Sequence, residues 1–223
     1  MIMPTILVVA CVLSTGFFIW TEYKWQQKNT IITKGISSLL FISIGLCCYI
    51  SKDVPAEYAL WIIAALVFGL IGDLFLVFPN IIKSFILGLV AFLIGQIIYG
   101  VTFLRFNGFM AYDVLIYAAI VGCSLLAYKR SSLQLGKMKM PVLFYLLIIA
   151  FMYTMGVSTL YKGGFNTATT VFIVAGATLF LISDILLAFV RFQPDSKPYL
   201  RGMNLALYYS GQILLALSIC TFN

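Results

Sequence analysis

Long apolar segments alternate with short polar stretches along the whole chain. Eight such segments can be counted, and each has roughly the length that an α-helix needs to cross the hydrocarbon core of a bilayer. They cover residues 5–20, 34–50, 58–78, 82–104, 112–128, 141–161, 168–190 and 202–222. The stretches between them are too short for another folded unit. We therefore expect a single all-α transmembrane domain over residues 1–223.

The composition also indicates a membrane protein. Apolar residues make up 63% of the 223 residues and charged residues only 9%, a balance that soluble domains do not reach. The first segment follows no positively charged stretch and offers no clear small-residue cleavage site, so we interpret it as a membrane span rather than a signal peptide. We expect an integral protein of a bacterial plasma membrane.

The net charge of +7 is better explained by membrane topology than by nucleic-acid binding. Cytoplasmic loops of membrane proteins are enriched in Lys and Arg. Only Lys52, Arg105 and Lys162 follow segments 2, 4 and 6. Eleven basic residues lie in or beside the stretches after segments 1, 3, 5 and 7, namely Lys24, Lys28, Lys34, Lys83, Lys129, Arg130, Lys137, Lys139, Arg191, Lys197 and Arg201. We therefore expect these odd-numbered connections in the cytoplasm and both termini outside.

The cysteines and the absence of histidine limit the possible chemistry. The five cysteines, Cys11, Cys47, Cys48, Cys123 and Cys220, all fall inside apolar segments, where a cysteine usually serves as a small packing residue. They form no extracellular disulfide pattern, and without histidine they make a poor metal-binding set. We expect neither a metal site nor another cofactor.

Two carboxylates lie deep inside apolar segments. These are Asp73 and Asp184, whereas the other five acidic residues lie in connections or at segment ends. A carboxylate in the hydrocarbon region costs at least about 2.5–3.5 kcal/mol on insertion scales, so it usually faces the protein interior and has a function. The two aspartates are therefore the first candidates for a functional site.

The surroundings of these aspartates are similar. Residues 64–78 (AALVFGLIGDLFLVF) and 175–189 (AGATLFLISDILLAF) share six of fifteen positions, the aspartate among them, and the next segment of each half contains a Gly-Gln pair, Gly95-Gln96 and Gly211-Gln212. Apolar segments always share some residues, but the aspartate and the Gly-Gln pair favour a parallel repeat of four spans. Both aspartates then lie about 8–9 Å below the cytoplasmic interface, at 1.5 Å per residue from the expected ends of their segments.

Other polar side chains are expected at a similar level. The candidate substrate-binding residues are Lys34, Asn80, Tyr145, Asn204, Tyr208 and Gln212. Each also has an ordinary explanation, because a lysine at a segment end is often only an interfacial anchor and a tyrosine often belongs to the aromatic belt or the core. Gln96 lies closer to the middle of the membrane, where a hydrogen bond between helices is its simplest use.

Two carboxyl groups that share an apolar site do not both ionise readily. One protonated acid beside one carboxylate is the arrangement that general acid–base hydrolysis requires. A lipid with its head group near Lys34 and the basic connections would place the start of its chain beside the aspartates. We therefore expect cleavage of a membrane lipid close to its glycerol backbone.

Several strings resemble the YhhN family of eight-span membrane proteins. They are GDLFLVF, FLIGQIIYGVTF, MPVLFYLLIIAFM, GATLFLISDILLAF and LALYYSGQILLA, and the resemblance covers most of the chain from about residue 34 onward. Animal members are lysoplasmalogenases, which hydrolyse the vinyl-ether bond of lysoplasmalogens to a fatty aldehyde and a glycerophospho-choline or glycerophospho-ethanolamine. The residues that match polar positions of the family are Lys34, Asp73, Tyr145, Asp184, Tyr208 and Gln212.

The resemblance implies a lysophospholipid substrate taken from the bilayer, with no cofactor and no nucleic acid. A vinyl ether resists base but accepts a proton on its β-carbon from an acid, which gives an oxocarbenium ion. We expect Asp184 to donate this proton and an ionised Asp73 to stabilise the cation and orient water, although the residues alone do not distinguish the two roles. Oligomeric partners cannot be inferred from the sequence.

Three other functions would use the same residues. A proton-coupled transporter of a small molecule or lipid also has parallel repeats and intramembrane carboxylates, although these spans show few midplane interruptions. An intramembrane aspartyl protease would resemble Gly-x-Gly-Asp at one aspartate, whereas this chain has Gly-Leu-Ile-Gly-Asp at residues 69–73 and no Pro-Ala-Leu sequence. A purely structural role would hold helices together, and Asp→Asn substitutions would then change little.

Overall fold

The computed structural model describes residues 2–25, 30–52, 54–78, 81–194 and 196–222, and in these residues it contains helices and no β-strand. The long helices are α1 (Ile2–Trp25), α2 (Thr30–Ser51), α3 (Ala56–Phe75), α4 (Ile82–Asn107), α5 (Ala111–Arg130), α6 (Lys139–Val157), α8 (Thr167–Phe192) and α9 (Pro198–Thr221). The 3-10 helix η1 (Gly136–Met138) precedes α6, and the short α7 (Thr159–Lys162) follows it within the same span. In the described residues, eight segments are long and apolar enough to cross a membrane. The predicted all-α fold with eight spans is confirmed.

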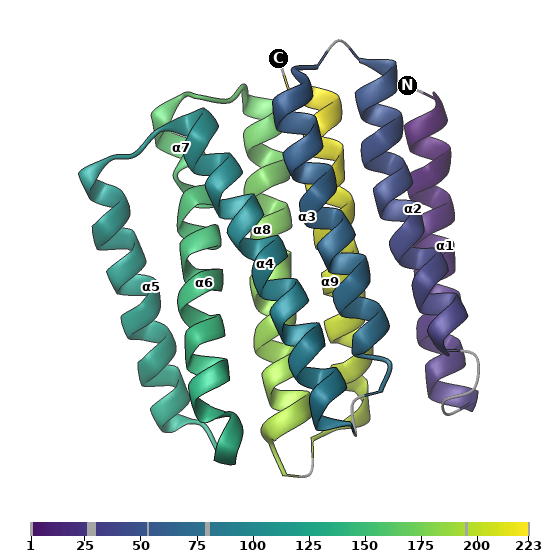
Figure 1. Cartoon of the computed structure of the whole chain (residues 1–223), viewed down its shortest axis with the longest axis vertical. Helices are drawn as coiled ribbons and strands as arrows, with labels where there is room; N and C mark the ends of the chain where they lie inside the picture. The colour runs from purple at the N-terminus through teal and green to yellow at the C-terminus, as the bar shows by residue number, and fades with distance from the viewer. Residues whose placement is uncertain (1, 26–29, 53, 79–80, 195, 223) are drawn as a thin grey trace.

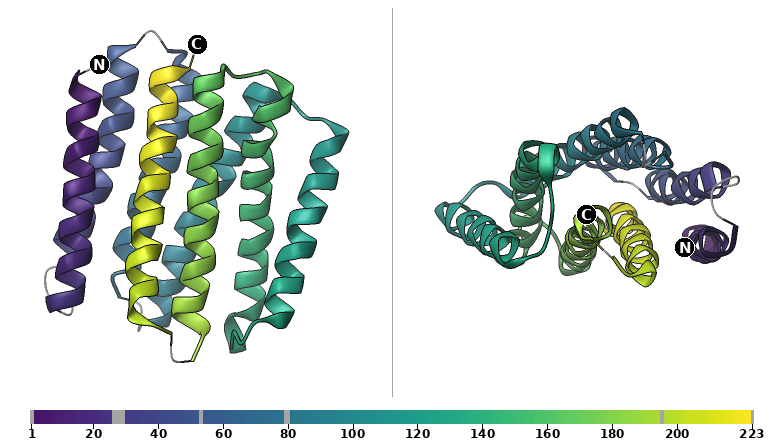
Figure 2. Two further views of the ribbon diagram at one scale, coloured as in Figure 1. Left: turned by 180° about the vertical axis from the view of Figure 1, so that it is seen from behind. Right: turned by 90° about the horizontal axis from the view of Figure 1, so that it is seen from below.

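Long helices that follow one another along the chain run in opposite directions, and most of these pairs lie side by side, whereas α6 lies between α4 and α5 (Figure 1). The pairs α1 with α2, α3 with α4, and α8 with α9 pack along each other, and α9 also contacts α1, α2 and α3. Seen from the end, α1, α8 and α9 lie opposite a row formed by α2, α3, α4 and α6 (Figure 2). Helix α5 lies at one edge, where it packs on α6 and, among the described residues, is joined to α7 by the ion pair of Asp113 with Lys162.

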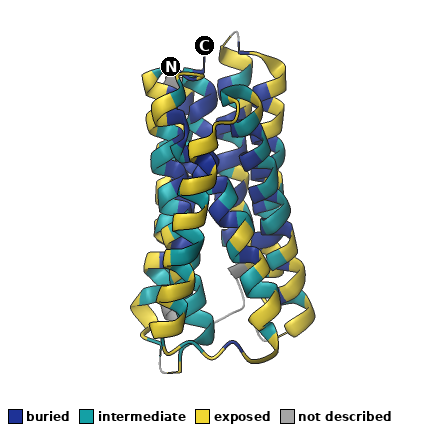
Figure 3. Cartoon of the chain, turned by 90° about the vertical axis from the view of Figure 1, so that its left-hand side faces the viewer, coloured by how far each residue is buried: buried dark blue, intermediate teal, exposed yellow. Residues whose placement is uncertain are grey.

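The outer surface of the bundle is apolar. Large hydrophobic side chains such as Leu13, Ile50, Leu115 and Met140 are exposed, and exposed residues run along the outside of the helices while buried ones lie between them (Figure 3). Lipid tails solvate such a surface, and the helices then associate through close packing and polar contacts rather than through the hydrophobic effect. These eight apolar helices fit an integral membrane protein.

The two ends of the bundle differ in charge. We call the end that carries both chain termini the terminal end, which is the upper edge in Figure 1. The basic end is the opposite one, formed by the last turns of α1, α3, α5 and α8 and the first turns of α2, α4, α6 and α9.

At the terminal end, the side chain of Asn166 caps α8 by accepting a hydrogen bond from the backbone N of Thr169 (2.9 Å). At the basic end, Pro198 occupies the first turn of α9, where its fixed φ favours a helix start.

Equivalent small residues bring two helices close together within each half of the predicted repeat. A Cβ atom on Gly95 would lie 3.2 Å from the carbonyl oxygen of Ala65, and one on Gly211 would lie 2.9 Å from the carbonyl oxygen of Gly176. Ala65 and Gly176 occupy the same position in the two similar segments, as do Gly95 and Gly211. The same close contact therefore joins α3 to α4 and α8 to α9. Helices α3 and α8 also run in the same direction (Figure 1), and both features agree with a parallel repeat.

The predicted equal depth of the two aspartates is wrong when it is measured from the helix ends. Helix α3 ends at Phe75 and not at residue 78, so Asp73 lies two residues from the end of its helix. Asp184 lies eight residues before the end of α8 at Phe192. Pro79 follows in the sequence and disfavours helical backbone at the residue before it, a signal that the hydrophobic pattern alone does not include.

The prediction that all five cysteines are packing residues is also wrong. Cys48 and Cys220 form a disulfide that joins α2 to α9 near the terminal end, across 172 residues of sequence. Among the described residues, Cys11, Cys47 and Cys123 are free thiols. The sequence places both bonded cysteines in apolar spans, and only the pairing of α2 with α9 brings them together.

Candidate active site

Asp73 lies on α3 among polar side chains from α2 and α9. Its Oδ1 is 3.1 Å from Nζ of Lys34, and its Oδ2 accepts hydrogen bonds from Ser38 Oγ (2.6 Å) and Tyr208 OH (2.9 Å). The hydroxyl of Tyr209 is 3.5 Å from the same Oδ2. Asp73 and Lys34 are only 2% and 4% exposed, so the carboxylate and the ammonium neutralise each other inside the protein.

The position of Lys34 differs from the expected one. We expected its ammonium to reach toward lipid head groups, whereas it pairs with Asp73 within the bundle. Gln212 extends the same network, because its Nε2 donates to Tyr208 OH (3.3 Å) and its Oε1 accepts from Tyr99 OH (2.8 Å). The structure therefore brings three predicted polar residues, Lys34, Tyr208 and Gln212, together around Asp73.

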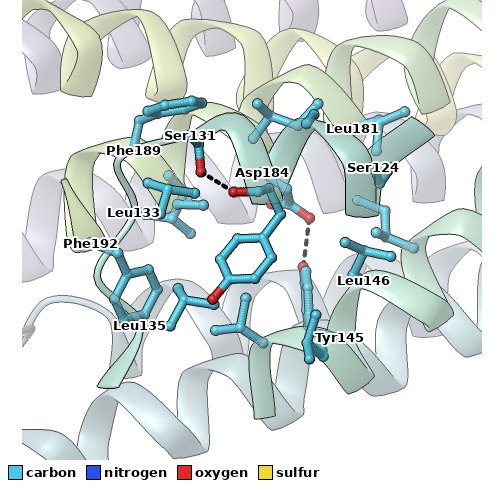
Figure 4. Close-up of a pocket in the computed structure, with 18 of the residues that line it drawn as sticks. Ser124, Ser131, Leu133, Leu135, Tyr145, Leu146, Leu181, Asp184, Phe189 and Phe192 are labelled. Carbon is cyan, nitrogen blue, oxygen red and sulfur yellow. Dashed lines mark hydrogen bonds between the residues drawn. The ribbon is translucent and has the colours of Figure 1, made fainter. Parts of the chain in front are cut away.

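Asp184 lies on α8 in a different environment. Its Oδ2 accepts hydrogen bonds from Tyr145 OH on α6 (2.7 Å, Figure 4) and from Gln96 Nε2 on α4 (3.1 Å). Gln96 Nε2 also donates to Tyr145 OH (3.1 Å). Among the described residues no cation forms an ion pair with Asp184. Neutral donors hold this carboxyl group, whereas an ammonium and hydroxyl groups hold Asp73.

The structure describes one of the two asparagines that we predicted as substrate-binding residues. Asn204 on α9 donates from Nδ2 to the backbone oxygen (2.8 Å) and the Oγ (2.9 Å) of Ser183, the residue before Asp184. This contact fixes the turn of α8 that presents Asp184. Asn80 lies outside the described residues.

Both carboxyl groups line one cavity. This polar cavity has a volume of about 210 Å³ and contains Asp73, Asp184 and three cations, Lys34, Arg191 and Arg201, in its wall. Asn204 and Tyr208 also line it. The two aspartates therefore adjoin one cavity.

A second cavity begins at Asp184. This apolar cavity has a volume of about 370 Å³, lies among α4, α5, α6 and α8, and contains Asp184 and Tyr145 in an otherwise mostly hydrophobic wall (Figure 4). Phe85, Asp184 and Leu187 line both cavities, so the two adjoin there. Along α8 the lining extends from Leu181 to Phe192, about 16 Å at 1.5 Å per residue.

A separate buried ion pair lies at the terminal end. Nζ of Lys162 is 2.5 Å from Oδ2 of Asp113, and the two side chains are 2% and 1% exposed. Asp113 Oδ1 also accepts from Tyr161 OH (2.6 Å) and Oδ2 from the backbone N of Met110 (2.8 Å). The sequence predicts Asp113 at the start of an apolar segment and Lys162 in a connection. Neither lines the cavities described above, and their contacts fasten the start of α5 to α7.

Sequence reasoning missed several residues of the site. Ser38, which contacts Asp73, has no pattern that separates it from ordinary residues of an apolar span. Arg191 and Arg201 were counted only as topology signals, and nothing in the sequence indicates that they line a cavity.

Within the described residues, no three His, Cys, Asp or Glu side chains come together as metal ligands would.

Comparison with known proteins assigns the chain to a family. A model described as the YhhN family matches residues 29–219, which include both aspartates and every side chain named above around them. No curated protein and no solved structure matches the chain. With a match over most of its length, the chain belongs to the YhhN family.

Proposed function

We propose that this protein is an intramembrane hydrolase that cleaves the vinyl-ether bond of lysoplasmalogens. The products would be a fatty aldehyde and a glycerophospho-choline or glycerophospho-ethanolamine. The observation that carries the proposal is the junction at Asp184, where a polar cavity with a second carboxyl group and three cations meets a long apolar cavity. A lysoplasmalogen has the same division, since its polar head and its single chain meet at the ether bond.

The proposal also gives the protein an orientation. We infer that the basic end faces the cytoplasm of a bacterial cell and that both termini lie outside, because basic residues are enriched in cytoplasmic loops. The disulfide between Cys48 and Cys220 supports this orientation, since it lies at the other end and disulfides persist in oxidising compartments. The substrate would then enter from the cytoplasmic leaflet.

Asp184 serves as the acid in the proposed reaction. Tyr145 and Gln96 both bind its Oδ2, which leaves Oδ1 to carry the proton. Transfer of this proton to the β-carbon of the vinyl ether gives an oxocarbenium ion and ionised Asp184. Water then attacks the α-carbon and returns a proton to Asp184. The resulting hemiacetal collapses to the aldehyde as its hydroxyl proton passes to the departing glycerol oxygen.

Asp73 supplies a fixed carboxylate group in the same cavity. Its ion pair with Lys34 and its bonds from Ser38 and Tyr208 hold the carboxylate in one position before any substrate binds. Because Lys34 balances its charge, Asp73 acts on a cation that develops nearby only through the carboxylate end of this preorganised pair. The different partners of the two aspartates are our reason for giving them different roles.

Aldehyde release by the purified protein in detergent tests this function. The substrates are lysoplasmenylethanolamine, its ester-linked lyso analogue, and the alkyl ether that lacks the double bond. We expect aldehyde from the vinyl ether and no cleavage of the other two lipids, because only the vinyl ether can be activated by carbon protonation. Absence of turnover by a folded protein would contradict the proposal. Proton flux into liposomes that depends on the aspartates would then favour the transporter.

A further inference from the structure

Arg191 brings an uncompensated positive charge to the polar cavity. Lys34 and Arg201, the other two cations in its wall, each have a carboxylate partner. Among the described residues Arg191 has none, and its guanidinium carbon lies 4.9 Å from the centre of the Phe85 ring. Since a cation at a cavity wall attracts anions, this cavity is suited to a ligand that carries negative charge.

The positions of the two arginines place this charge at the basic end of the cavity. Arg191 lies in the last turn of α8 and Arg201 in the first turn of α9. Asp184 lies seven residues before Arg191 on the same helix, about 10 Å along the helix axis. An anionic group bound by the arginines would therefore lie nearer the basic end than the group that reacts at Asp184.

Contacts to neighbouring side chains restrict both guanidinium groups. Arg201 Nε donates to Glu22 Oε1 (2.6 Å), and its Nη2 contacts the same oxygen. Arg191 rests against the buried ring of Phe85, which lines both cavities. A guanidinium group that packing already positions loses less conformational entropy when it binds a ligand.

We propose that Arg191, together with Arg201 in the same cavity wall, binds the phosphate group of the lysolipid. The identity of the lipid rests on the function proposed above, whereas the choice of phosphate rests on the cations. A guanidinium offers parallel N–H donors that match two phosphate oxygens. The glycerol carbons would span the space between these arginines and Asp184, and the chain would enter the apolar cavity. The protein would thus select phosphate-bearing lysolipids over neutral ether glycerols with the same chain.

Binding of uncleavable ligands tests this site without using the reaction. The ligands are 1-O-hexadecyl-glycero-3-phosphoethanolamine and 1-O-hexadecylglycerol, which have the same chain and differ in the phosphate head. Affinities follow from the dependence of the unfolding temperature on ligand concentration in neutral detergent. Arg191→Gln should weaken binding of the phospholipid about ten- to a hundredfold and leave the neutral ether unchanged. Arg191→Lys should fall between, since it keeps the charge and loses the paired donors.

Lys197→Gln is the matched control. It removes the same charge from the connection next to Arg191, but Lys197 is exposed and does not line the cavity, so both affinities should stay unchanged. The proposal is wrong if Lys197→Gln acts as strongly as Arg191→Gln, if Arg191→Gln weakens both ligands equally or neither, or if the wild-type protein does not bind the phospholipid.

A competition experiment distinguishes a site for a lipid phosphate from a site for a soluble phosphate. Glycero-3-phosphoethanolamine carries the same phosphate without a chain, and it should compete far less well than the lysolipid. Equal competition would assign the site to a soluble phosphate and overturn the proposal. None of these ligands contains a vinyl ether, so binding that depends on Arg191 together with no aldehyde release would refute the hydrolase and leave the phosphate site intact.

Discussion

Nζ of Lys34 and Oδ1 of Asp73 lie 3.1 Å apart, and both side chains are buried. Asp184, the counterpart of Asp73 in the other half of the chain, has hydrogen bonds from Tyr145 and Gln96 instead. Two aspartates in similar sequence surroundings therefore differ in their electrostatic partners. This difference underlies the roles that we propose for them.

Replacement of Lys34 with Met should destabilise the protein. It leaves a buried carboxylate without its cation, and breaking a buried pair in this way costs about 3–5 kcal/mol. Thermal unfolding in detergent should show a clear fall in the unfolding temperature. The double variant Lys34→Met with Asp73→Asn should recover much of it, because the remaining charge is removed as well. A single variant as stable as the wild type would show that the pair contributes little.

Tyr145→Phe should slow turnover more than it weakens binding. The substitution removes the hydroxyl that donates to Asp184 Oδ2 at 2.7 Å, and the loss of one such bond to a carboxyl group corresponds to about a tenfold fall in kcat. Tyr117→Phe is the control, because among the described residues that hydroxyl bonds the backbone oxygen of Leu147 at an exposed site. Equal effects of the two variants on kcat would argue against a role for Tyr145 in positioning the acid.

Leu146→Trp should shorten the lipid chain that the protein accepts. Leu146 lines the apolar cavity (Figure 4), whereas the next residue, Leu147, is exposed on the outer surface. If the larger ring excludes two or three methylene groups, the KM for a long-chain substrate should rise about 15- to 60-fold at roughly 0.8 kcal/mol per methylene. Leu147→Trp should leave KM unchanged. A similar rise in both variants would mean that the chain does not occupy this cavity.

The disulfide gives a test of orientation. If the terminal end lies outside the cell, Cys48 and Cys220 should be bonded in protein purified without reductant. Mass spectrometry after alkylation should then find these two residues unlabelled and Cys123, which is exposed, labelled. Alkylation of both Cys48 and Cys220 before reduction would contradict the oxidised pair and weaken the proposed topology.

The hydrophobic pattern alone predicted most of the fold. The spans could be predicted because a transmembrane helix needs about 20 mostly apolar residues. The two aspartates could be identified as candidates because charged residues are rare in such segments. The glycines that bring α3 to α4 and α8 to α9 together also lie in the repeated strings, Gly95 before Gln96 and Gly211 before Gln212.

The partners of each aspartate were harder to predict. Ser38 binds Asp73 from α2, but a serine in an apolar span is common and carries no positional signal. The pairing of Lys34 with Asp73 depends on which helices are neighbours, and so does the Cys48–Cys220 bond. Sequence periodicity describes one helix at a time, so it does not predict contacts between helices that are distant in the chain.

Turnover of lysoplasmenylethanolamine in D₂O by the wild-type protein and by Asp184→Asn tests the central claim most directly. The aldehyde is trapped as it forms and its isotope content is read by mass spectrometry. We predict that the wild type releases aldehyde with one deuterium on the carbon next to the carbonyl, and that Asp184→Asn, still folded, is slower by at least about a hundredfold. No aldehyde from the wild type, aldehyde without deuterium, or an undiminished rate in Asp184→Asn would contradict proton donation by Asp184.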